Sequence, residues 1–92
     1  METVISTVRF MRKQAKDCAT LPIHYQVEIL VNCWNWLTAP YRPMTDKEHV
    51  VCKHLARRIR KELSTCPYWH ESDSGRLWYD GQRIPLEKQC RN

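Results

Sequence analysis

The segment from Thr45 to Leu63, TDKEHVVCKHLARRIRKEL, constrains the fold more than any other part of the chain, because it carries both a helix start and a helical apolar period. Thr45 followed by Glu48 forms the pattern of a capping box, in which each side chain bonds the backbone N–H of the other residue. Apolar side chains then recur every four residues, at Val51, Leu55, Ile59 and Leu63. The segment therefore predicts a helix over about 46–63 with one buried side.

Basic side chains occupy a second side of this predicted helix, at Lys53, Arg57, Arg60 and Lys61. The whole chain has a formal net charge of +5, and residues 45–63 hold six basic and three acidic side chains. A cationic helix face is typical of a surface that meets phosphate or an acidic protein. We therefore expect a binding site on the 46–63 helix.

Two further helices are predicted over about 2–18 and 22–37. In the first, a single apolar stripe is formed by Val4, Val8, Met11, Ala15 and Cys18. The second has a core stripe of Ile23, Val27, Leu30, Val31, Trp34 and Leu37, and an opposite, outer stripe of Tyr25, Ile29, Cys33 and Trp36. Because a helix that is apolar nearly all round is buried on several sides, we expect it at the centre of the domain, or with its outer side against a partner.

The C-terminal third of the chain predicts a β-hairpin over about 76–84. Asp80-Gly81 stands between two strand-like runs, and an Asp-Gly pair suits the tight turn of a two-residue hairpin. Trp78 and Ile84 are the expected packing residues. With 92 residues and no low-complexity segment, the chain indicates a single α+β domain over 1–92, mostly α, with three helices and a C-terminal hairpin.

The apolar runs are too short and too interrupted to cross a bilayer, and the first residues lack the pattern of a signal peptide. Five scattered cysteines, an odd number, favour reduced thiols over a disulfide framework. We therefore expect a cytoplasmic protein with no membrane partner, in which Cys18, Cys33 and Cys52 are buried.

Neither metal binding nor catalysis is favoured by the sequence. Cys66 and His70 resemble a chelating pair, but structural zinc requires four converging ligands, usually in two pairs with short spacers. A chain with two glycines holds no glycine-rich phosphate loop, and no Cys–His spacing indicates an activated thiol. We expect no bound metal, no cofactor and no enzymatic activity.

The order of three helices and a ribbon is also that of a winged-helix DNA-binding domain. In this alternative the third helix enters the major groove and the hairpin reaches the DNA backbone, through Lys53, Arg57, Arg58, Lys61, Arg76 and Arg83. The proline-rich link over 37–45 argues against it, because a helix-turn-helix is joined by about three or four residues. It is at least as consistent with the sequence that the basic face of this helix is simply solvated, or that it attracts phosphate without sequence preference.

The segment 64–70, STCPYWH, joins the third helix to the C-terminal third and carries a proline between a thiol and two aromatic rings. Tyr and Trp contribute much of the energy at protein interfaces, so Pro67, Tyr68 and Trp69 form a second candidate contact for a protein partner. The Cys66–Pro67 bond can be cis or trans. The alternative, which we slightly favour, is that the proline ends the helix and the rings fold back onto the domain.

With its basic 53–61 helix face, its Pro67 loop and no catalytic set, the chain resembles the small host-takeover proteins of lambdoid phages, in particular those of the anti-RecBCD type. The resemblance implies a non-enzymatic protein with a partner in the host recombination nuclease, and also a host prolyl isomerase as partner. It implies no catalytic residue.

The combined prediction is a small basic, non-enzymatic protein, phage-encoded, that inhibits or modulates a host nucleic-acid-processing complex by protein–protein contact. The residues expected to bind the partner are Lys53, Arg57, Arg60, Lys61, Pro67, Tyr68 and Trp69. Direct binding of DNA through the third helix and the hairpin is the alternative. A third class is a homo-oligomer built on the outer stripe of the second helix.

Overall fold

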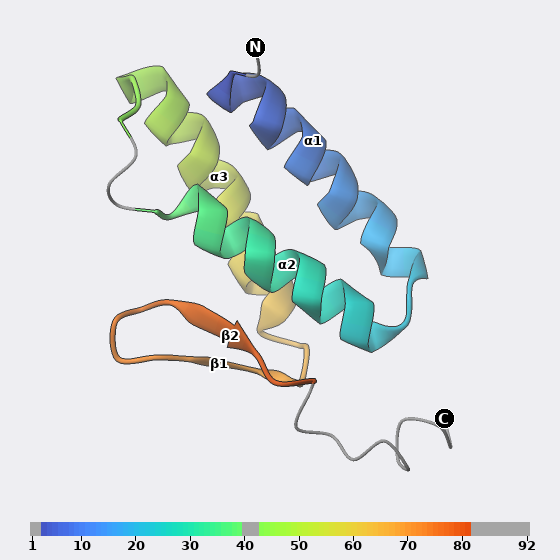
Figure 1. Ribbon diagram of the computed structural model, residues 1–92. Coiled ribbons are helices and arrows are strands. Elements are labelled where there is room, and N and C mark those ends of the chain that lie inside the picture. Colours follow the sequence, from blue (N-terminus) through green and yellow to red (C-terminus); the bar gives the residue numbers. More distant parts are fainter. Residues whose placement is uncertain (1–2, 40–42, 82–92) are drawn as a thin grey trace.

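The computed structural model describes residues 3–39 and 43–81, which form three α-helices and a two-stranded antiparallel hairpin. The elements in chain order are α1 (Val4–Asp17), the short 3-10 helix η1 (Cys18–Thr20), α2 (Ile23–Leu37), α3 (Asp46–Leu63), β1 (Trp69–Glu71) and β2 (Leu77–Tyr79) (Figure 1). The predicted α+β architecture, mostly helical, is thus confirmed, and α3 spans the residues predicted for it. None of the described helices is long and apolar enough to cross a membrane.

The start of α3 is fixed by the expected capping box. The backbone N–H of Glu48 donates to Thr45 Oγ1 at 3.2 Å, and the N–H of Thr45 donates to Glu48 Oε1 at 2.8 Å. The bond from the Thr45 backbone, more than any other cause, holds the pKa of the Glu48 carboxyl below its ordinary value, since it favours the charged form. Thr3 and Ser6 form the same arrangement at the start of α1, so both helices begin where side chains satisfy free N–H groups.

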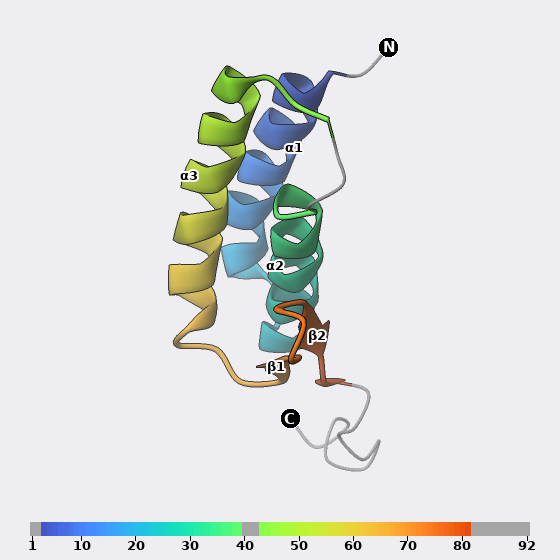
Figure 2. The ribbon, with the colours of Figure 1, turned by 90° about the vertical axis from the view of Figure 1, so that its left-hand side faces the viewer.

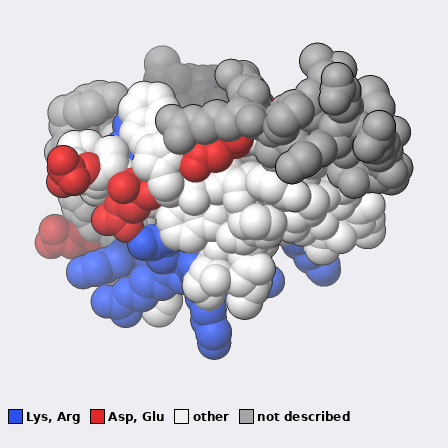
Figure 3. All heavy atoms as spheres, turned by 90° about the horizontal axis from the view of Figure 1, so that it is seen from below, with Lys and Arg blue, Asp and Glu red and all other residues white. Residues whose placement is uncertain are grey.

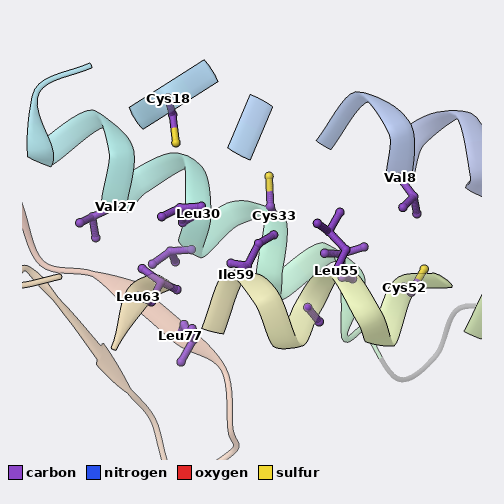
Figure 4. Packing of buried hydrophobic residues seen from close by; sticks show 13 residues of the cluster. Val8, Cys18, Val27, Leu30, Cys33, Cys52, Leu55, Ile59, Leu63 and Leu77 are labelled. Atoms are coloured by element: carbon purple, nitrogen blue, oxygen red, sulfur yellow. The ribbon is translucent and has the colours of Figure 1, made fainter. Parts of the chain in front are cut away.

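The interior is built from aliphatic and sulfur-containing side chains that the three helices and β2 turn toward one another. The buried residues, most of them labelled in Figure 4, are Val8, Cys18, Val27, Leu30, Val31, Cys33, Leu37, Cys52, Leu55, Ala56, Ile59, Leu63 and Leu77. The predicted burial of Cys18, Cys33 and Cys52 is confirmed. Among the described residues no polar or charged side chain is buried, so apolar contact alone defines how the helices pack.

Two details predicted for α2 are wrong. Ile23, assigned to the core stripe, is 36% exposed because it lies in the first turn of α2, beside the exposed Leu21 and Pro22. Cys33, assigned to the outer stripe, is only 3% exposed because α1 packs over that side of α2. Figure 4 shows its sulfur pointing toward α1.

The central position expected for α2 is confirmed: the helix contacts α1, α3 and β2 (Figures 1 and 2). Its contact with the hairpin includes a polar clamp. Asn35 Nδ2 donates to the backbone carbonyl of Leu77 at 2.8 Å, and the backbone N–H of Leu77 donates to Asn35 Oδ1 at 3.0 Å. The amide thus pairs with the outer edge of β2 as a third strand would, and it attaches the hairpin to the helices.

The hairpin forms, but with a different pairing from the predicted one. β2 contains the predicted strand residues 77–79, yet it pairs with β1 upstream, with Trp69 opposite Tyr79 and Glu71 opposite Leu77. The chain turns at 72–76, where Gly75 has a φ of 89° and its N–H donates to the carbonyl of Ser72 at 2.9 Å. Ser74-Gly75 therefore supplies the turn, because glycine reaches this left-handed conformation without strain. The predicted strand residues 82–84, Ile84 included, lie outside the described residues.

Asp80-Gly81, the predicted turn, instead follows the hairpin. A Cβ atom at Gly81 would collide with the ring and hydroxyl of Tyr79, so the glycine leaves room for that side chain. Trp78, an expected packing residue, is 47% exposed, because the alternation of side chains along β2 turns the neighbouring Leu77 into the core.

Candidate functional site

Three exposed cations follow one another along α3, and we call Lys53, Arg57 and Lys61 the α3 basic face. They are spaced four residues apart, about one turn of helix. Within residues 3–39 and 43–81 none of the three has an acidic partner. Figure 3 shows Lys and Arg side chains gathered along one side of the molecule, with Asp and Glu side chains at the border of that side. This face is therefore free to meet negative charge.

Arg60 and Arg58, also expected at binding surfaces, are both engaged within the domain. The guanidinium of Arg60 pairs with Glu71 of β1 and lies 4.6 Å from the centre of the Trp69 ring. Arg58 Nε lies 3.6 Å from Glu62 Oε1, one turn further along α3. Arg58 also borders a different hollow, beside α1 and η1. The cationic surface of α3 thus centres on the α3 basic face.

An open groove of about 690 Å³ runs between the C-terminal half of α2 and the middle of α3. We call it the α2–α3 groove. Its lining residues are Trp34, Leu37, Thr38, Ala39, Met44, His49, Cys52, Lys53, Ala56, Arg57 and Arg60. Two of the three cations of the α3 basic face therefore form part of its wall. A hollow of this size lies within the range of sites that hold small ligands or anchoring side chains.

The sequence prediction found the cations of this groove but missed its apolar floor. Trp34 and Leu37 come from α2, Met44 from the link before α3, and Ala56 from α3 itself. The sequence signal for such a floor is Ala56, a small residue on the buried side of α3, where Leu55, Ile59 and Leu63 are larger. A small residue leaves space where neighbouring elements contribute larger ones.

The aromatic rings after α3 fold back onto the domain. Trp69 Nε1 donates to the carbonyls of Leu63 and Cys66, both at 2.8 Å, and so satisfies one carbonyl at the end of α3 and one in the segment after it. The Tyr68 ring stacks on His24 of α2 with 4.5 Å between ring centres. Pro67 is exposed, and no peptide bond among the described residues is cis. The geometry corresponds to the fold-back alternative for 64–70, and of Pro67, Tyr68 and Trp69 it leaves only Pro67 exposed.

Of the residues expected to contact DNA, Arg58 and Arg76 are engaged with other side chains of the domain. Lys53, Arg57 and Lys61 share the α3 basic face, whereas Arg58 pairs with Glu62. On the hairpin, the guanidinium of Arg76 lies 5.1 Å from the centre of the Trp78 ring. Arg83 lies outside the described residues. The hairpin carries Glu71 and Asp73, directly followed by Asp80, against one Arg, Arg76, and no Lys, and this charge is unlike that of a wing that meets DNA phosphate.

The outer side of α2 is not a continuous apolar surface. Tyr25 is 59% exposed, but Cys33, two turns further along, is in the core. Trp36 and Ile29 are half-buried. The surface proposed for a homo-oligomer is therefore interrupted by the packing of α1.

The Cys66 and His70 pair does not converge on a common point. Cys66 Sγ donates to the carbonyl of Glu62 at 3.4 Å, while His70 Nδ1 lies 2.7 Å from Asp80 Oδ2. In the part of the chain that the structure describes, no three His, Cys, Asp or Glu side chains lie close enough to hold a metal ion. Cys90 lies outside that part.

Comparisons with protein-family models, with curated proteins and with solved structures found no match to this chain.

The four described cysteines should differ sharply in reactivity. Burial raises the pKa of the Cys33 thiol to about 11 and also raises the pKa of Cys18, to which Glu62 contributes. With a pKa near 11, roughly a thousandth of the thiol is ionised at pH 8. In a Cys90→Ser background at pH 8, we expect Cys66 to react with an aromatic disulfide reagent about a hundredfold faster than Cys18, Cys33 or Cys52. Mass spectrometry of the partly labelled protein measures this order.

In denaturant all four thiols should react at one rate, which provides the control. Rapid labelling of Cys33 in the folded protein would contradict the described core.

Proposed function

We propose that this chain is a small basic, non-enzymatic binding protein of the cytoplasm that captures an acidic surface of a partner protein. Following the resemblance to anti-RecBCD-type phage proteins, the proposed partner is a host complex that acts on nucleic acid and that the chain inhibits or modulates. The observation that carries the proposal is the position of the α3 basic face beside the apolar α2–α3 groove.

The two parts of this surface support binding in different ways. Cations at the rim of an interface steer an acidic partner and set its orientation, while their individual ion pairs contribute only about 0.2–1 kcal/mol each. Most of the affinity comes from apolar side chains buried near the centre of a contact. A cationic row along an apolar groove offers both, which a solvated charged face alone does not.

Direct DNA binding is the competing function, and the described structure favours it less. Phosphate contact requires cations spread along the duplex, whereas Arg58 and Arg60 are held by Glu62 and Glu71. The acidic side chains of the hairpin would also face the backbone that a wing contacts. The two functions nevertheless share the α3 basic face, so an experiment has to separate them.

Reversal of the α3 basic face by Lys53→Glu, Arg57→Glu and Lys61→Glu tests the proposal. Arg60 is left in place because it braces Trp69 and Glu71. In affinity purification from a bacterial lysate treated with nuclease, we expect the variant to recover at least about tenfold less of the partner than the wild-type chain does. Quantitative mass spectrometry of the captured proteins measures the difference.

A labelled DNA duplex titrated with the wild-type chain at low and moderate salt completes the test. Capture that survives nuclease and is lost in the variant supports protein contact. Partners that disappear on nuclease treatment, together with tight duplex binding, would establish the DNA-binding alternative instead.

A further inference from the structure

The lining of the α2–α3 groove indicates which kind of partner segment binds there, an inference that rests on the proposed function. The floor of the groove is apolar and includes Trp34, Met44 and Cys52. Cys52 Sγ and Met44 Sδ lie 3.7 Å apart. Thiol and thioether groups are polarizable and make favourable contacts with aromatic rings. This floor therefore suits one large apolar side chain, an aromatic one above all.

The two walls of the groove differ in charge. Lys53 and Arg57 form the α3 wall, whereas Thr38 and Ala39, at the end of α2, form an uncharged wall. No acidic side chain lines the groove within the described residues. An occupant that complements both walls carries negative charge on only one side of its apolar residue.

The spacing of the cations indicates the conformation of that occupant. Lys53 and Arg57 are one helical turn apart, which matches two acidic residues four positions apart on a facing helix. Lys61 continues the same row by another turn. A groove that binds an amphipathic helix contacts side chains at this helical spacing.

We infer that the α2–α3 groove binds an acidic amphipathic helix of a partner protein. The helix inserts one aromatic side chain between α2 and α3, and it sets its acidic residues against Lys53 and Arg57.

Three synthetic helical peptides, each labelled with fluorescein, test this inference on the full chain. The first carries two glutamates four residues apart on one helix face and one phenylalanine on the neighbouring face, the second has alanine in place of the phenylalanine, and the third has lysines in place of the glutamates. By fluorescence anisotropy at low salt, we expect the first peptide to bind about tenfold or more tightly than the second, because burial of the ring is lost. The lysine peptide should not bind.

A variant at the uncharged wall separates the contribution of the groove to binding from that of the cations. Ala39→Trp should weaken binding of the phenylalanine peptide and leave the alanine peptide unaffected. The matched control is Ala19→Trp, at an exposed alanine outside the groove, which should change neither. On the wild-type chain, the phenylalanine peptide should shift the NMR signals of the Met44 and Ala56 methyl groups but not that of Ala19, and this readout requires no variant.

Equal affinity for the phenylalanine and alanine peptides would overturn the aromatic anchor and leave the proposed function in place. Binding of neither peptide, with partner capture still dependent on the α3 basic face, would also overturn this inference alone. Partner capture that is indifferent to reversal of that face would instead remove the proposed function. A concentration-dependent dimer that protects the Met44 and Ala56 methyl groups would assign the groove to a second copy of the chain and overturn the inference.

Discussion

Replacement of Ile59 by alanine should lower the free energy of unfolding by about 3 kcal/mol, one of the largest effects expected for a single substitution in this core. Ile59 is fully buried in the core, on the side of α3 that packs against the other helices. Its truncation removes apolar contact and leaves a cavity that neighbouring side chains fill only in part. A domain of this size has a total stability of about 5–15 kcal/mol, so the variant loses a large share of it. Urea unfolding followed by far-ultraviolet circular dichroism measures the change.

The matched control is Val50→Ala, on the same helix. Val50 is 55% exposed, and we expect a change within about 0.5 kcal/mol, as for other surface positions. If the two substitutions had equal effects, the described orientation of α3 would be wrong.

Replacement of Asn35 by leucine should destabilise the domain by about 2–3 kcal/mol and detach the hairpin before the helices unfold. The side chain holds both backbone groups of Leu77, a residue only 1% exposed. Leucine keeps the approximate volume but leaves the N–H and carbonyl of Leu77 without partners, and an unsatisfied backbone group away from water is costly. Amide hydrogen exchange should therefore accelerate at Leu77 more than at Ile59.

Asn32→Leu is the control for this experiment, because Asn32 is an exposed asparagine on the same helix. It should leave the exchange rate of Leu77 unchanged. A wild-type exchange rate for Leu77 in the Asn35→Leu variant would show that the amide clamp does not hold the hairpin.

The helices were predictable because their signals are local. Thr45 and Glu48 are three residues apart, and the apolar stripe of α3 repeats every four residues, so neighbouring positions settle both the start and the buried side. The prediction of the hairpin depended instead on which of two turn signals is used, Ser74-Gly75 or Asp80-Gly81. The observed pairing is stabilised by contacts that Asn35 makes with Leu77 and that Trp69 makes with the end of α3. A local sequence pattern does not reveal such contacts.

The candidate site, too, was predictable only where its signals are local. The cations of the α3 basic face follow from helical periodicity, and the prediction found all three. That Arg60 would be held by Glu71 and Trp69 could not be predicted, because those partners lie on another element. The groove was also missed, since Trp34, Met44 and Ala56 reach it from separate segments.

The location of charge on the chain, rather than its amount, should determine binding of the partner. The comparison that isolates it sets reversal of the α3 basic face beside an equal reversal on α1, by Arg9→Glu, Arg12→Glu and Lys16→Glu. Each triple variant changes the formal net charge from +5 to −1, because three cations become three anions. All three α1 positions are exposed.

The measurement is the amount of partner that each variant captures from nuclease-treated lysate, relative to the wild-type chain. We predict that capture falls at least about tenfold for the α3 variant and stays within about twofold of wild type for the α1 variant. Equal loss in both variants would contradict a localised site and leave net charge as the cause of binding.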